Sequence, residues 1–158
     1  MVQLNTIEKS EILSNEMCDG LPAVPVDTME GFCMGLGAQG FEFPRGVLPL
    51  SSKEILVVDM GRGWARKKGS LWRVVKEGDT YRKTRILRNL DQPHAIVKSP
   101  SGLIYLASID RVSILEMGAS SARLVDVIGG DSGLEPLPVT GRHPLKQLAF
   151  DSAGNLFI

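Results

Sequence analysis

The sequence PHAIVKSPSGLIYLAS, residues 93–108, contains a pattern that recurs along the chain. In order, it has a Pro, a polar or basic residue, an apolar run, a turn rich in Ser and Gly, and a second apolar run. Two further stretches have the same order, namely FPRGVLPLSSKEILVVD at 43–59 and HPLKQLAFDSAGNLFI at 143–158. Short apolar runs bounded by turn residues are typical of β-strands, so each copy predicts a hairpin.

The spacing of the copies predicts a repeat architecture. Pro44 and Pro93 lie 49 residues apart, and Gly102 and Gly154 lie 52 residues apart. A period of about 50 residues with strands as the repeated elements is typical of the blades of a β-propeller. We therefore expect an all-β fold built from consecutive blades.

The first two copies each extend into four predicted strands. In the first blade we expect strands at 47–50, 55–58, 71–75 and 84–90, with the basic loop GRGWARKKG at 61–69 after the second strand. In the second blade we expect strands at 95–97, 103–106, 111–117 and 123–128, followed by a long Gly- and Pro-rich loop at 129–141. The third copy supplies only a hairpin, at 148–150 and 156–158.

Two blades and one hairpin cannot close a ring, because they leave sheet edges and an inner face uncovered. We therefore expect a partial β-propeller that continues beyond the C-terminus. The predicted domain organisation is an irregular N-terminal segment at 1–41 and an incomplete propeller domain at 42–158.

Composition and charge exclude several classes of protein. The chain has 158 residues, 43% of them apolar, which is enough for one hydrophobic core. Its 18 basic and 18 acidic side chains cancel, so no general attraction to nucleic acid is expected. No apolar run is long enough to span a membrane, and the acidic first 17 residues do not resemble a signal peptide.

The chain has two cysteines, Cys18 and Cys33. A disulfide between them would suit an exported protein and would stabilise it by about 3 kcal/mol. The alternative is two unrelated buried thiols, and the sequence leaves both interpretations open. Neither cysteine has a His or a further Cys at ligand spacing, which argues against a zinc site.

Several stretches resemble the soluble pyrroloquinoline-quinone-dependent sugar dehydrogenases, the glucose/sorbosone dehydrogenase group. LDQPHAIVKSPSGLIYLASIDRVSILEM is similar to an early blade of that family, and RGVLPL, EILVVDMGRG and GSLWRV together are similar to another. The most specific piece is His143, followed at +7 by Phe150 and at +11 by Gly154. The family places its catalytic histidine at the head of such a hairpin.

This resemblance implies a six-bladed propeller that holds pyrroloquinoline quinone and Ca2+ at the mouth of its central channel. His143 would act as the general base on the C1 hydroxyl of a small sugar, while hydride passes to the quinone and later to an external electron acceptor. The family is periplasmic or secreted. Its calcium ligands and most quinone contacts lie on later blades, beyond Ile158, so this chain alone is expected to be inactive.

Other candidate site residues cluster near the heads of the first strands. Aligning the turns places Arg45, His94 and Lys146 in equivalent positions, where they would ring the channel mouth. Together with Arg142 they would suit a cofactor with three carboxylates. Arg142 and Lys146 would also lower the pKa of His143 and favour its neutral form. Arg142 stands where the glucose-oxidising members carry an Asp, which argues against glucose as the substrate.

The remaining polar residues are assigned structural roles more readily than chemical ones. Trp64 is expected in a solvated basic loop, although an aromatic ring near a sugar site can stack on the sugar. Asp59 is expected to cap a turn rather than ligate calcium. Asp131 and Glu135 are only two carboxylates, far fewer than the six to eight oxygens that calcium takes.

Two rival functions remain open. A non-catalytic β-propeller could bind protein or glycan through its loops. A calcium-dependent lactonase propeller would need carboxylates and Asn at the heads of the inner strands, where this chain has Arg45, His94 and Lys146. The lactonase is therefore the weakest of the three hypotheses.

Overall fold

The computed structural model describes residues 16–118, 121–140 and 146–158. Within these ranges the chain is all-β, with antiparallel strand pairs, one short 3-10 helix and no α-helix. The predicted fold class is confirmed at this level. In the same ranges, no helix is long and apolar enough to cross a membrane.

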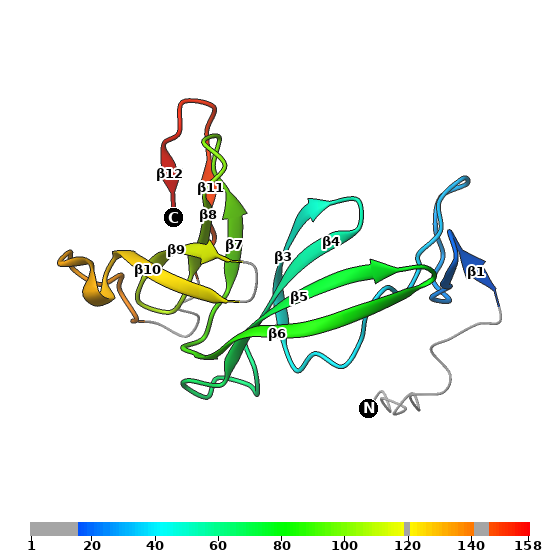
Figure 1. The fold of residues 1–158 in the computed structure, drawn as a ribbon, viewed down its shortest axis with the longest axis horizontal. Helices are drawn as coiled ribbons and strands as arrows, with labels where there is room; N and C mark the ends of the chain where they lie inside the picture. Colours follow the sequence, from blue (N-terminus) through cyan, green and yellow to red (C-terminus); the bar gives the residue numbers. More distant parts are fainter. Residues whose placement is uncertain (1–15, 119–120, 141–145) are drawn as a thin grey trace, which may run out of the picture. The chain divides into compact units, whose positions relative to one another are not determined.

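The first large sheet is a four-stranded meander in which each strand pairs with its neighbour in sequence (Figure 1). Its strands are β3 (Pro44–Ser51), β4 (Glu54–Asp59), β5 (Gly69–Glu77) and β6 (Thr80–Leu90). The four strands predicted from the first copy are confirmed. The last four residues of β4 are buried.

The second large sheet repeats this arrangement (Figure 1). Its strands are β7 (Ala95–Lys98), β8 (Ile104–Ala107), β9 (Val112–Met117) and β10 (Ala122–Ile128). The hairpin of the third copy is also present, as β11 (Ala149–Phe150) and β12 (Leu156–Phe157). After β10, the stretch predicted to be a loop contains a 3-10 helix, η1 (Gly130–Ser132).

Matching turns account for the repeat in the sequence. Gly102 and Gly154 occupy the same place in the β7–β8 and β11–β12 turns, and their φ angles are 90° and 89°. Glycine adopts this left-handed conformation without the steric cost that other residues bear. Before Gly154, the Asp151 carboxylate accepts hydrogen bonds from both the backbone and the side-chain nitrogen of Asn155, at 2.8 and 2.7 Å. The turn is thereby closed locally.

The two large sheets share one hydrophobic core. Its buried members come from β4, β5, β7, β8 and β9: Leu56, Val58, Leu71, Ile96, Leu106 and Leu115. The first strands of the sheets, β3 and β7, also approach closely. A Cβ at Gly46 would lie 3.1 Å from the carbonyl oxygen of His94, so a side chain there would crowd β7. The two meanders therefore pack as neighbours in space as well as in sequence.

A second cluster joins the second sheet to the β11–β12 hairpin. Its buried members are Ala95, Ala107, Val112 and Leu148. Tyr105 of β8 and Phe150 of β11 contribute a ring contact, with centroids 5.0 Å apart. Each copy of the pattern is thus packed on the one before it.

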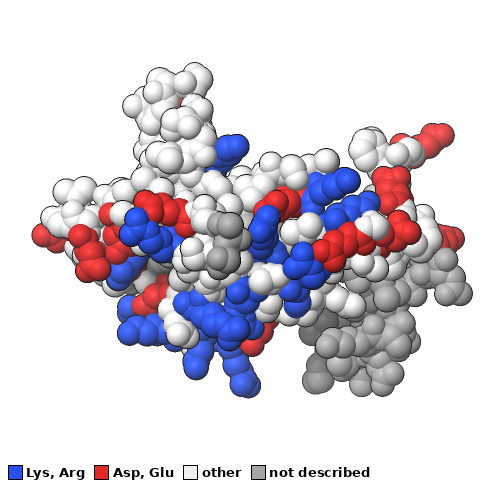
Figure 2. Space-filling view, in the orientation of Figure 1, with Lys and Arg blue, Asp and Glu red and all other residues white. Residues whose placement is uncertain are grey.

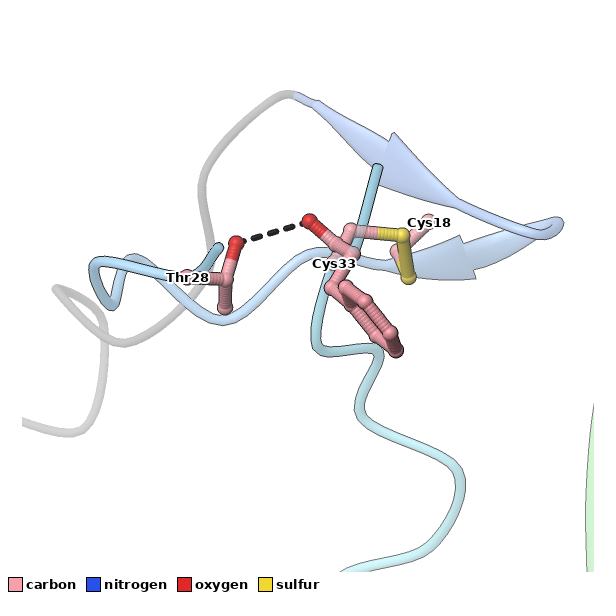
Figure 3. The surroundings of a disulfide bond; sticks show 4 residues. Cys18, Thr28 and Cys33 are labelled. Atoms are coloured by element: carbon pink, nitrogen blue, oxygen red, sulfur yellow. Dashed lines mark hydrogen bonds between the residues drawn. A yellow bond between two sulfur atoms is a disulfide. The ribbon is translucent and has the colours of Figure 1, made fainter. Parts of the chain in front are cut away.

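Residues 16–39 and Lys76–Arg82 form a separate compact unit. It contains β1 (Met17–Cys18) and β2 (Leu21–Pro22), together with an isolated bridge between Ala23 and Gly35. Cys18 and Cys33 are joined in a disulfide (Figure 3). Nearby, the Thr28 hydroxyl donates a hydrogen bond of 2.7 Å to the carbonyl of Phe32. The stretch expected to be irregular therefore has short paired segments closed by a covalent link.

Candidate functional site

Five chain segments meet at one end of the first sheet. The strand register pairs Pro44 with Asp59 and Asp59 with Ser70, so β3 begins where β4 ends and β5 begins. β6 runs back toward this end, and the connection 91–94 leads from it to β7. Because Gly46 approaches the carbonyl of His94, the start of β7 lies beside the start of β3. Arg45 and His94 are therefore brought to the same edge.

His94 is the most unusual polar residue of this edge. The residue is 5% exposed, and its backbone nitrogen donates a hydrogen bond of 2.8 Å to the carbonyl of Ala107. Neither ring nitrogen has a hydrogen-bond partner among the described residues. Buried polar groups are normally paired, because an unmade hydrogen bond costs about 1–3 kcal/mol. The hydrogen-bonding capacity of the ring is thus unused by the described residues, and because both nitrogens are shielded from solvent, a ligand reaches them only when the surrounding segments move apart.

Burial and the nearby charge of Arg45 both favour a neutral imidazole at His94. Burial lowers the pKa of His94 below its usual value of 6.5, and the positive charge of Arg45 lowers it further. A neutral imidazole has one donor and one acceptor nitrogen. Arg45 itself is exposed, with its guanidinium 4.8 Å from the centroid of the Phe43 ring. The edge therefore offers a permanent cation beside an uncharged hydrogen-bonding ring.

The connection from β6 to β7 is strained on the approach to His94. Asn89 and Gln92 have φ angles of 56° and 46°, in the left-handed region that most side chains avoid. Gln92 is buried, and its amide nitrogen donates to the carbonyl of Trp64. Its amide oxygen has no partner among the described residues. Backbone strain of this kind is concentrated at functional sites.

A charged contact fixes the loop between β4 and β5 against the same connection. Arg66 donates through Nε to both oxygens of Asp91, at 2.7 and 2.9 Å. Trp64 lies in this loop and is 46% exposed, in agreement with the solvated basic loop predicted for it. Sequence reasoning did not single out Gln92, because a Gln before a Pro carries no sign of burial or backbone strain. The structure adds it to the candidate site.

The other predicted site residues are distributed differently. Lys146 donates a hydrogen bond of 2.7 Å to the carbonyl of Pro138, so its amine ties down the long loop after β10. His143 and Arg142, the predicted base and its basic neighbour, lie outside the described residues. Of the predicted site, the described residues that lie at this edge are therefore Arg45 and His94.

Asp59 has the turn role that the sequence favoured. Its Oδ1 accepts hydrogen bonds from the backbone nitrogens of Phe43 and Gly61, at 2.7 and 3.0 Å, and its Oδ2 accepts one from Glu42 at 3.0 Å. Three backbone donors thus occupy the carboxylate. The buried Asp59 holds the start of the first sheet rather than presenting free oxygens to a cation.

Calcium does not fit the described residues. The one set of three potential metal ligands found among them is Cys18, Asp19 and Cys33. Both sulfurs of this set belong to the disulfide, and calcium takes oxygen ligands. The described side chains of the candidate site can bind an anion and exchange hydrogen bonds with it.

No family model matches the chain, and neither the curated proteins nor the solved structures compared with it yield a match.

Proposed function

We propose that the sheets are consecutive blades of a β-propeller that oxidises an aldose or related sugar with pyrroloquinoline quinone. Two four-stranded meanders in sequence order, with first strands side by side, support the propeller architecture. The remaining support is the sequence resemblance that places a catalytic histidine at His143.

The observation that carries the proposal is the exposed guanidinium of Arg45 beside the buried imidazole of His94, which has no hydrogen-bond partner among the described residues. Pyrroloquinoline quinone has three carboxylates, and an arginine binds a carboxylate through two parallel hydrogen bonds. Once the segments that shield its ring move apart, the neutral His94 can donate one more hydrogen bond to the same anion. The residues therefore fit the anionic part of the quinone, and Arg45 and His94 would hold it.

The chemistry divides between the cofactor and the chain. When bound, the quinone supplies an acceptor for the two electrons of hydride. His143 takes the proton of the sugar C1 hydroxyl on an imidazole nitrogen, as general bases do when their pKa lies near the working pH. Oxidation at this carbon gives a lactone or an acid. Calcium, which the resemblance implies, would be held by other blades of the propeller, because the described residues hold no cluster of carboxylates for it.

The test uses the protein encoded by the complete gene. Quinone and Ca2+ are added, and sugar-dependent reduction of a dye is followed over a panel of aldoses. We expect activity that requires the quinone and falls at least about 100-fold in His143→Ala, the usual size of a general-base contribution. Gln147→Ala, which removes an exposed polar side chain four residues away, is the matched control and should keep full activity.

Two outcomes would count against the proposal. If the complete protein binds no quinone, a dehydrogenase of this kind is ruled out and a non-catalytic propeller that binds protein or glycan becomes the better account. If His143→Ala keeps the activity of Gln147→Ala, the resemblance assigns the wrong base.

A further inference from the structure

The arginines of the chain fall into two groups. Among the described residues, five donate to carboxylates of neighbouring Asp or Glu side chains: Arg66, Arg73, Arg82, Arg111 and Arg123. The other four, which form no such pair, are Arg45, Arg62, Arg85 and Arg88. Three of these four line a single groove, so most of the arginines without an acidic partner lie in one place.

This groove, which we call the basic groove, has a volume of about 390 Å³. The loop between β4 and β5 forms one side and the second half of β6 the other. It is lined by five cations and one carboxylate: Arg62, Lys67, Lys68, Arg85, Arg88 and Glu42. Figure 2 shows Lys and Arg side chains gathered at the lower centre of the molecule, where Figure 1 places this loop.

The groove cations are poorly compensated. The side chains of Arg62, Lys67, Lys68 and Arg88 form no hydrogen bond or ion pair with another described residue, and all four are exposed. Arg85 stacks on the ring of Trp72, 4.4 Å from its centroid, and is thereby held without a counter-charge. Like charges placed together repel, and a bound anion relieves that repulsion. The site is electrostatically suited to a ligand with several negative charges.

The loop that carries three of the cations is fixed at both ends. A Cβ at Gly61 would lie 2.2 Å from the carbonyl oxygen of Lys68, so the two ends of the loop touch. Its middle is held by the hydrogen bond from Gln92 to the carbonyl of Trp64 and by the ion pair of Arg66 with Asp91. A fixed loop loses less entropy when it binds a ligand.

We propose that the basic groove is a binding site for a compact polyanion with two or more carboxylate or phosphate groups. Guanidinium groups bind both kinds of oxyanion in bidentate fashion, and Ser70 and Asn89 add neutral donors to the lining. The volume lies in the range of small-molecule sites. A long nucleic acid would need an extended basic stripe, whereas the arginines outside the groove are mostly paired with carboxylates.

This site is independent of the proposed dehydrogenase chemistry, and binding to the 158-residue chain tests it. Pyrophosphate and citrate are titrated separately by calorimetry at low salt, so the two arms distinguish a phosphate ligand from a carboxylate ligand. We expect at least one of them to bind and its affinity to fall as NaCl is raised.

Matched double variants locate the binding. Lys67→Gln/Lys68→Gln removes two groove lysines, and Lys53→Gln/Lys98→Gln removes two exposed lysines that do not line it. We expect the groove variant to bind the anion at least about tenfold more weakly and the control to stay within about twofold of the parent. Arg85→Gln/Arg88→Gln should reproduce the loss from the opposite side of the groove, and thermal unfolding verifies that each variant is folded.

Three results would overturn the proposal. The groove and control variants could weaken binding equally, which would indicate non-specific attraction to the whole surface. The second such result is that neither pyrophosphate nor citrate binds at millimolar concentration. A heparin oligosaccharide could bind while neither small anion does, which would assign the surface to a long polymer instead.

Discussion

His94 combines properties that rarely coexist in a structural histidine. Its ring is buried, and neither nitrogen is paired among the described residues. The turn alignment predicts equivalent positions for His94 and Arg45, and in the structure the charge of Arg45 acts on the His94 ring. Its burial could not be predicted, because that depends on β3 and β7 packing side by side around Gly46.

The lowered pKa of His94 makes stability depend on pH. The unfolded chain binds a proton on this residue near pH 6.5, whereas the folded chain resists protonation to lower pH. The unfolded state therefore holds more protons in this window, and the free energy of unfolding should fall as pH decreases from about 6.5 toward the folded pKa. Urea denaturation at pH 7.5, 6.5 and 5.5 measures the trend.

The matching variants separate His94 from the other histidine. His94→Gln should flatten the pH dependence, while His143→Gln should retain the slope of the parent. A slope that disappears in His143→Gln and persists in His94→Gln would contradict the assignment.

Asp59 gives a second prediction for a single residue. In Asp59→Asn, the side-chain amide NH2, a donor, would face the backbone N–H of Glu42 in place of an accepting oxygen. A buried donor left unpaired costs about 1–3 kcal/mol, so the free energy of unfolding should fall by that amount. Asp27→Asn, at an exposed position, is the control for the charge change. Equal stability of the two variants would show that the Asp59 carboxylate does not hold the sheet.

At the level of elements, the β6–β7 connection packs against the start of β5. A Cβ at Gly69 would lie 2.2 Å from Cδ of Pro93 and 3.0 Å from the carbonyl oxygen of Leu90. Gly69→Ala should therefore displace the connection and lower the free energy of unfolding by about 1–3 kcal/mol. Gly37→Ala, where the new Cβ would meet Tyr81 at an ordinary 3.5 Å, is the control. If Gly69→Ala leaves the free energy of unfolding unchanged, the β6–β7 connection moves aside without cost and the prediction is wrong.

The disulfide stabilises a segment that has few other constraints. Cys18 and Cys33 are separated by 15 residues, and a loop of that length is stabilised by about 3 kcal/mol when it is cross-linked. Cys18→Ser/Cys33→Ser should therefore accelerate amide hydrogen exchange at Ala23 and Leu36, whose nitrogens donate backbone hydrogen bonds in this unit. Unchanged exchange at these amides would mean that the segment holds its structure without the bond.

The strands were predictable where apolar runs are bounded by turns, and less so elsewhere. β6 starts at Thr80, earlier than the expected 84, because its first residues are polar and pair in a hairpin with β5. The two-residue strands β1 and β2 carry no periodicity at all. Their pairing depends on a chain reversal at Asp19 and Gly20, and no hydrophobic pattern predicts that reversal.

For the whole molecule, the shared core is the feature with the largest energetic consequence. Leu71 of the first sheet and Leu106 of the second are fully buried in one cluster. Leu71→Ala and Leu106→Ala should each cost about 2–5 kcal/mol and lower the midpoint of the same cooperative transition. Two resolved transitions, each sensitive to one variant, would show that the sheets fold independently.

The clustering of cations in the basic groove could not be predicted from the sequence. The sequence predicts a solvent-exposed basic loop at Arg62, Lys67 and Lys68, because runs of basic residues are usually solvated. Arg85 and Arg88 lie in β6, and only the return of that strand to the loop brings the five cations together. The fold class follows from local patterns, whereas charge clusters of this kind depend on the assembled sheet.

The central claim is that Arg45 and His94 hold the anionic part of a quinone cofactor, and equilibrium binding tests it most directly. Pyrroloquinoline quinone is dialysed against the protein encoded by the complete gene, against Arg45→Gln, and against Arg123→Gln, an exposed arginine of β10. We expect at least about tenfold weaker binding in Arg45→Gln and parental affinity in Arg123→Gln. Equal affinity in all three proteins would contradict it.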